Sequence, residues 1–180
     1  MRNFLLGFIF ALLVILVGGY LYLKQGYVDF SADQQPSRVE RHFAMAAVDA
    51  STDRHASDQK NPLPVTDENL VAGAVLFRDH CAGCHGTPSN PETQFSKSFN
   101  PPVPGFFKEG ADMADNQNFY IIRHGIRWTG MPAWNRTLSE NQTWQIVSFL
   151  SHIEKLPPAA LKEFEPTQAS ATPAAAPPTR

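Results

Sequence analysis

An unbroken apolar run lies close to the start of the chain, from Phe4 to Leu23, and holds no charged side chain. A helix needs about 20 predominantly apolar residues to cross the hydrocarbon core of a bilayer, and this run provides them. A cleaved signal peptide usually has a shorter apolar region and a small-residue cleavage site, and Gly18-Gly19-Tyr20 is a poor match for such a site. Residues 1–24 are therefore predicted to form an uncleaved transmembrane signal anchor.

The polar segment that follows, residues 25–65, has no sustained apolar period. Its composition favours a flexible linker, and only a weak pattern around Val39 and Phe43 hints at a short amphipathic helix. As a flexible chain, such a linker has an end-to-end distance of roughly 35 Å. The alternative is a docking segment that folds on a partner.

Helical periodicity extends from Thr66 to His80, and the first of these residues is a suitable N-cap. Leu70, Ala74 and Phe77 recur at the spacing of one helix face. Gly73 inside this helix costs about 1 kcal/mol relative to alanine, but it permits the close approach of another backbone.

Two further stretches carry helix signals, Asp115 to His124 and Leu138 to Leu156. Gly125 ends the first stretch, and Ser139 with Gln142 forms a capping box at the start of the second. The second stretch is apolar over more than half of its surface, which predicts deep burial. Together with the preceding helix, these stretches predict an all-α fold.

The segments outside these helices differ in composition. Residues 86–110 contain five prolines, which exclude long helices and central strands, and four phenylalanines, which are too many for a disordered loop. They are predicted to form an ordered loop. Residues 157–180 are rich in alanine and proline and are predicted to be a disordered tail, with a short helical pattern at residues 161–164.

Charge gives little information on partners. The chain has 15 Lys and Arg against 17 Asp and Glu, a formal net charge of −2. This balance gives no sign of a surface that binds nucleic acid, and no single-sign field that would identify a protein partner.

The candidate chemistry is concentrated in Cys81-Ala82-Gly83-Cys84-His85. Two cysteines separated by two residues and followed at once by a histidine are a c-type haem attachment signal. The spacing lets each thiol form a thioether with one vinyl group of the macrocycle, and the histidine then offers an imidazole nitrogen to the iron. A zinc site and a redox dithiol are the alternatives, but the chain has no second cysteine pair and no βαβ context.

The second axial ligand of the iron decides the function. A strong protein ligand favours electron transfer, whereas an open position lets the iron bind small molecules. Met131 is the main candidate, because the flanking Gly130 and Pro132 place it in a loop that can approach the haem closely. The alternative ligands are Met113, His124 and His152.

Two further groups of residues are predicted to contact the haem or its ligand. A carbonyl in Asn100-Pro101-Pro102 is expected to accept a hydrogen bond from the ring N–H of His85. At least one of four side chains near the methionine is expected to contact the haem propionates: Arg123, Arg127, Trp128 or Trp134.

These features resemble a class I c-type cytochrome, close to the membrane-anchored monohaem cytochromes c of bacteria. Gly73 and Phe77 resemble positions of that family's N-terminal helix, and Trp144 resembles a position of the C-terminal helix that crosses it. Thr129-Gly130-Met131-Pro132 resembles its axial methionine loop. The resemblance covers residues 66–156, which it predicts to be the cytochrome c domain.

The resemblance implies a small helical domain that encloses one haem c with low-spin iron. Cys81 and Cys84 would attach the haem covalently, and His85 and Met131 would be its iron ligands. It also implies that the protein has no small-molecule substrate and is not itself an enzyme.

The predicted function is one-electron transfer between redox proteins of the respiratory chain or periplasm. In bacteria, haem is attached covalently outside the cytoplasmic membrane, so the linker and the domain are expected in the periplasm, held by a single-pass anchor. One alternative is a haem subunit fixed within a larger oxidoreductase or oxidase complex. A less favoured alternative is a haem enzyme or gas sensor with an open sixth position.

Overall fold

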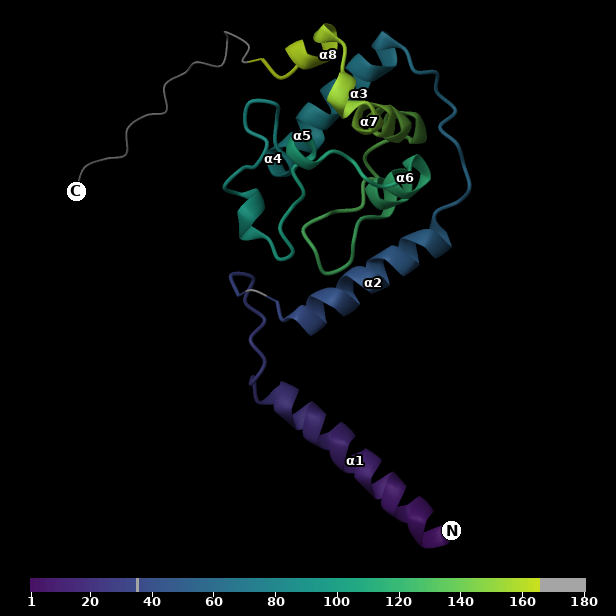
Figure 1. The fold of residues 1–180 in the computed structure, drawn as a ribbon, viewed down its shortest axis with the longest axis vertical. Coiled ribbons are helices and arrows are strands. Elements are labelled where there is room, and N and C mark those ends of the chain that lie inside the picture. The colour runs from purple at the N-terminus through teal and green to yellow at the C-terminus, as the bar shows by residue number, and fades with distance from the viewer. Residues whose placement is uncertain (35, 166–180) are drawn as a thin grey trace, which may run out of the picture. The chain divides into compact units, whose positions relative to one another are not determined.

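The computed structural model describes residues 1–34 and 36–165 of the chain (Figure 1). Every regular element of this described part is a helix, apart from one isolated bridge between Thr87 and Asn90. The chain divides into two compact units, Met1–Gln35 and Pro36–Arg180. The predicted all-α class is thus confirmed for the described residues.

The first unit is dominated by α1, Arg2–Lys24, none of whose residues is buried. At 1.5 Å per residue, its 23 residues span about 34 Å, which is sufficient for the hydrocarbon core of a bilayer. Within the described ranges, α1 is the one helix that is long and apolar enough to cross a membrane. This agrees with the predicted transmembrane segment.

The second unit is organised around the contact between α3, Asp67–His80, and α7, Glu140–Ser151. Gly73 makes this contact possible, because a Cβ at that position would overlap the carbonyl oxygen of Gln145 and lie 2.8 Å from Cβ of Phe149. Phe77 and Phe149 are both buried beside the contact, with ring centroids 5.0 Å apart. Gly73 was predicted to permit the close approach of another backbone, and the backbones of α3 and α7 do meet at this residue.

Short helices complete the second unit and connect its long ones. They are α4 (Ala82–His85), η1 (Ser96–Ser98), α5 (Phe106–Glu109), α6 (Asp115–His124), η2 (Ile153–Lys155) and α8 (Pro158–Lys162). The bounds of α6 agree with the prediction. Its N-cap is Ala114, whose N–H donates to Oε1 of Gln117 at 3.0 Å.

The segment expected to be a flexible linker contains α2, Arg38–His55, which belongs to the second unit. Ser37 and Glu40 form a capping box at its start. Near its end Thr52 is buried, and Oδ1 of Asp53 accepts a hydrogen bond from Nε2 of Gln117 in α6 at 2.6 Å. A cap and polar tertiary contacts hold this helix, and neither leaves a strong apolar period in the sequence.

The start of the expected disordered tail is also ordered. Ala160 of α8 is fully buried, and Phe164 packs against Phe77 and Phe149 with ring centroids 6.3 and 6.0 Å apart. Nη1 of Arg78 lies 2.6 Å from Oε2 of Glu163 and holds this segment to α3. The ordered part thus extends past Leu156, while residues 166–180 of the predicted tail lie outside the described residues.

Candidate functional site

The two cysteines and the histidine of the motif lie in one tight turn at the end of α3. The carbonyl oxygen of Cys81 accepts hydrogen bonds from the N–H groups of Cys84 and His85, at 3.1 and 2.9 Å. Gly86 then ends α4 with a φ of +84°, which L side chains rarely adopt. A Cβ there would also lie 2.5 Å from the carbonyl oxygen of Pro91. The turn therefore requires glycine immediately after the histidine.

The imidazole of His85 is held from one side by the ordered loop. Its Nδ1 lies 2.9 Å from the carbonyl oxygen of Pro104. A carbonyl oxygen only accepts, so Nδ1 carries the proton and Nε2 keeps its lone pair. The ring also stacks on Phe106, with centroids 4.7 Å apart. Position, tautomer and ring plane are thus fixed together, which is the usual support for a metal-ligating histidine.

The acceptor carbonyl differs from the expected one. We predicted it within Asn100-Pro101-Pro102, whereas the structure assigns it to Pro104, just before α5. Phe106 of α5 stacks on the imidazole, and Pro104 two residues before it provides the acceptor carbonyl. The prediction that a backbone carbonyl of this loop accepts from His85 was correct. The predicted residue was wrong, because the loop has no periodicity from which the acceptor could be identified.

Burial in the turn favours the neutral forms of the His85 imidazole and the Cys81 thiol. Burial lowers the pKa of His85, and the hydrogen bond to Pro104 opposes this shift only in part. Burial raises the pKa of the Cys81 thiol to about 12, and the neighbouring Cys84 adds to that shift. A redox-active dithiol has a lowered thiol pKa, so the direction at Cys81 argues against that reading.

Met131 lies in a closed loop between α6 and α7. Its carbonyl oxygen accepts from the N–H of Ile126 at 3.2 Å, and its own N–H donates to Oγ1 of Thr129 at 3.1 Å. Gly125 starts the loop with a φ of +66°. Gly130 packs so closely on the ring of Phe99 that a Cβ would overlap it. The methionine side chain is half-buried and packs against the core.

The alternative axial ligands have other surroundings. His124 is exposed at the end of α6, with its ring 4.6 Å from that of Tyr120. Nδ1 of His152 lies 2.8 Å from the carbonyl oxygen of Ser148, and this histidine lines a separate hollow beside residues 58–65. The carbonyl of Met113 is used by Asn118, whose Nδ2 donates to it at 2.9 Å.

The four side chains predicted to contact the propionates separate into two pairs. Nη1 of Arg123 donates to the carbonyl of Leu138 at 3.3 Å, and the ring of Trp134 lies 5.3 Å from that of His80. Arg127 and Trp128 are exposed, and Trp128 has a positive φ of 63°. The predicted propionate contact stays a prediction.

The zinc alternative finds no support in the described ranges. No group of three or more histidine, cysteine, aspartate or glutamate side chains there is arranged to hold a metal ion. Cys81 and Cys84 are both free thiols. Two thiols on one turn, one imidazole and one half-buried thioether are the kinds of groups that a haem c requires, two for its vinyl groups and two as candidate iron ligands.

The helical contact, the attachment turn and the methionine loop are the parts of a c-type cytochrome. Residues 68–150 match the model of the family described as cytochrome c oxidase, cbb3-type, subunit III, which is a family of c-type cytochromes. A comparison with curated proteins gave no match. Such a domain binds haem c and transfers electrons, which is the coarse function of this stretch.

Proposed function

We propose that the chain is a membrane-anchored one-electron carrier whose haem is attached through Cys81 and Cys84. His85 and Met131 are its axial ligands. The observation that carries this proposal is the hydrogen bond from Nδ1 of His85 to the carbonyl oxygen of Pro104. Of the two ring nitrogens of His85, it leaves Nε2 able to bind iron. A bound haem supplies an iron that alternates between the ferric and ferrous states.

The residues around the ligands favour rapid exchange of single electrons. The contacts of His85 with Pro104 and Phe106 hold the imidazole in one orientation in both oxidation states. The hydrogen bonds of the Met131 loop do the same for the thioether. A methionine ligand raises the reduction potential, and a half-buried environment raises it further by excluding water.

The anchor determines where this carrier works. α1 is proposed to cross the cytoplasmic membrane once, with the haem domain in the periplasm, where bacteria attach haem c. The partners are redox proteins of the membrane or periplasm, and neither a small-molecule substrate nor nucleic acid is involved. The protein is then an electron-transfer protein and not itself an enzyme.

A second candidate function is a haem subunit fixed within an oxidoreductase or oxidase complex. One observation favours it: α2 is folded onto the haem domain, so the connection to the anchor is shorter than expected. Even if fully flexible, the residues between Lys24 and Arg38 would span on average about 20 Å, compared with roughly 35 Å for the whole predicted linker. A short connection limits how far the haem domain can move along the membrane to reach partners. This suits a subunit that transfers electrons from a fixed position within a complex.

The visible spectrum of the haem-loaded protein, as wild type and as Met131→Ala, tests the ligand assignment. We expect a weak red charge-transfer band from thioether-bound ferric iron in the wild type and its loss in the variant. The same variant should lower the reduction potential. A wild-type spectrum of high-spin iron that changes on addition of cyanide would contradict the assignment.

The size of the haem-containing species in mild detergent separates the two candidates. A carrier would give one chain of 20.0 kDa with one haem, surrounded by detergent. A fixed subunit would remain in a larger assembly whose spectrum contains additional haem types. Salt washes of increasing strength provide the control, because they remove chance association but leave an apolar subunit interface intact.

A further inference from the structure

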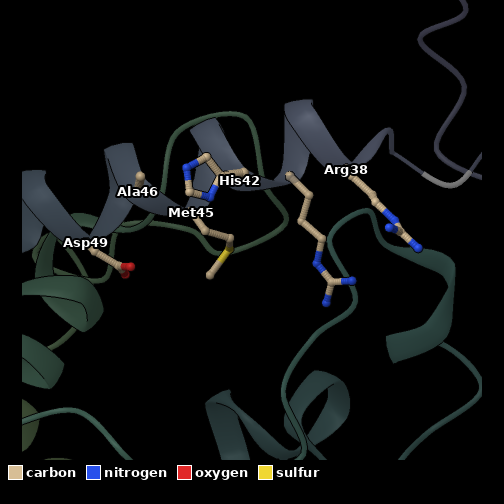
Figure 2. A pocket seen from close by; sticks show the side chains of 6 residues that line it. Arg38, His42, Met45, Ala46 and Asp49 are labelled. Carbon is tan, nitrogen blue, oxygen red and sulfur yellow. The ribbon is translucent and has the colours of Figure 1, made fainter.

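One face of α2 carries a row of side chains that the site described above does not use. These residues recur at helical spacing and line a hollow of about 360 Å³: Arg38, Arg41, His42, Met45, Ala46 and Asp49. Figure 2 shows the side chains of Arg38, Met45 and Asp49 extending from one side of α2. All six lie in the first two thirds of the helix.

The two ends of α2 are held differently. At its end, the ring of His55 stacks on Tyr120 at 6.2 Å, and just beyond the helix the carbonyl of Ser57 accepts from Nδ2 of Asn116 at 3.0 Å. At its start, the guanidinium groups of Arg38 and Arg41 have no hydrogen bond or ion pair with any described residue. The helix is therefore fixed to α6 at one end, while the two exposed cations at the other end have no partner among the described residues.

The start of α2 lies beside two loops of the second unit. In Figure 1 the first half of α2 runs alongside two segments of the same unit: the green loop between α6 and α7, and part of the teal segment between α4 and α5. Figure 2 shows ribbons of the same two colours around the hollow. The row of side chains on α2 thus lies near the loop between α6 and α7, which contains Met131 in sequence.

Helix chemistry gives no local reason for the two arginines. Arg38 and Arg41 lie in the first turn of α2, where the positive end of the helix dipole disfavours cations. Arg54 lies in the last turn, where the dipole favours it. A cation that the helix dipole disfavours and that lines a hollow suggests a bound ligand of negative charge.

A haem c carries two propionate carboxylates, which are ionised at neutral pH and need cationic partners. The planar guanidinium group matches a carboxylate with two parallel hydrogen bonds. Arg123 near the methionine loop is already engaged, with Nη1 on the carbonyl of Leu138 and Nη2 3.7 Å from Glu140. We propose that Arg38 and Arg41 of α2 bind the propionate carboxylates, so that α2 forms part of the haem site. This inference rests on the haem attachment proposed above.

The reduction potential of the full-length holoprotein tests this inference. The variants are Arg38→Gln/Arg41→Gln, the charge-conserving Arg38→Lys/Arg41→Lys, and Arg54→Gln as the control. Arg54 has the same charge on the same helix, but it projects roughly 140–160° away from the other two at 100° per residue. Each variant is first checked for covalent haem and a wild-type spectrum, so a failure of haem attachment is recognised as a failure of the proposed function.

We expect the double glutamine variant to have a lower potential, because an unpaired carboxylate near the iron stabilises the ferric state. The expected size is a roughly two- to fivefold shift of the ferrous-to-ferric ratio at a fixed applied potential, which is typical of partly exposed ion pairs. The difference from wild type should shrink at high salt. The lysine variant should retain most of the wild-type value, and Arg54→Gln should retain all of it. Equal potentials for the double glutamine variant and the control would overturn the inference.

Hydrogen exchange of the same holoproteins separates a haem contact from a helix effect. If the arginines bind the propionates, exchange of the amides at 38–49 should become faster in the double glutamine variant, while residues 52–57 at the α6 contact stay protected. If they only affect the helix, removing two cations from its first turn should stabilise it and slow the exchange. Slower or unchanged exchange at 38–49 would therefore contradict the proposal.

Discussion

The contact between α3 and α7 and the contact between α2 and α6 join helices by different means. The first is apolar: it has a glycine at the closest point, and the buried rings of Phe77 and Phe149 pack against each other beside it. The second is mostly polar, with side-chain hydrogen bonds from Gln117 and Asn116 and one ring stack. An apolar contact leaves a periodic pattern in the sequence, whereas a polar one leaves none, and the two should also differ greatly in energy.

The largest expected effect is on the apolar contact. Phe149→Ala removes a side chain with 0% exposure that packs against Phe77, Phe107 and Phe164. We expect a loss of about 3–5 kcal/mol in the free energy of unfolding, from lost burial and the cavity left behind. Denaturant unfolding of the holoprotein measures it. Phe43→Ala on α2 is the matched control, because that ring is 68% exposed and its loss should cost less than about 0.5 kcal/mol.

Gly73→Ala tests the closest point of the same contact. The new methyl group would overlap the carbonyl of Gln145, so α3 and α7 must move apart, at a cost of about 1–3 kcal/mol despite the better helix propensity of alanine. Gly18→Ala in α1 is the control, since nothing lies within 4 Å of a Cβ there and Gly18 is also in a helix interior. Equal stabilities for the two variants, measured in the same unfolding experiment, would show that the helices are not in backbone contact.

Ser37→Ala tests how the polar helix is held. Oγ of Ser37 accepts from the N–H of Glu40 at 3.1 Å, and its loss should cost about 1 kcal/mol. The effect should remain local: exchange at the start of α2 should accelerate, while the global unfolding free energy changes little. A matching loss of global stability would mean that α2 unfolds together with α3 and α7, and the contrast between the two contacts would then fail.

The smallest expected effect lies in the methionine loop. Trp128 has a φ of 63° and is 93% exposed, so it carries backbone strain without the benefit of burial. Trp128→Gly should raise the unfolding free energy by up to about 1 kcal/mol. A loss of stability instead would show that this ring has a partner in the haem-loaded protein, and the predicted propionate contact would gain support.

The comparison also explains how far the sequence could predict the structure. The extent of α6 and the role of Gly73 depend on local signals, namely turn glycines, caps and apolar spacing, which a single sequence contains. The helix predicted to reach Leu156 ends at Ser151 and continues as the short η2, because helix ends depend on tertiary contacts.

The parts that the sequence did not predict depend on contacts between distant segments. α2 is held by residues of α6, and Phe164 is buried only because Phe77 and Phe149 lie beside it. At the site, the attachment motif specified the two thiols and the imidazole by spacing alone. The carbonyl that orients the imidazole is 19 positions further along the chain, in a loop without periodicity, so its identity required the fold.

The central claim is that both axial positions of the iron are filled by this chain, which makes the domain an electron-transfer site. The most direct measurement is the visible spectrum of the ferrous holoprotein before and after addition of carbon monoxide, with Met131→Ala in parallel. The account predicts no change for the wild type and a clear shift for the variant, whose iron has an open position. A wild-type protein that binds carbon monoxide as readily as the variant would contradict the account and indicate an open iron suited to catalysis or gas sensing.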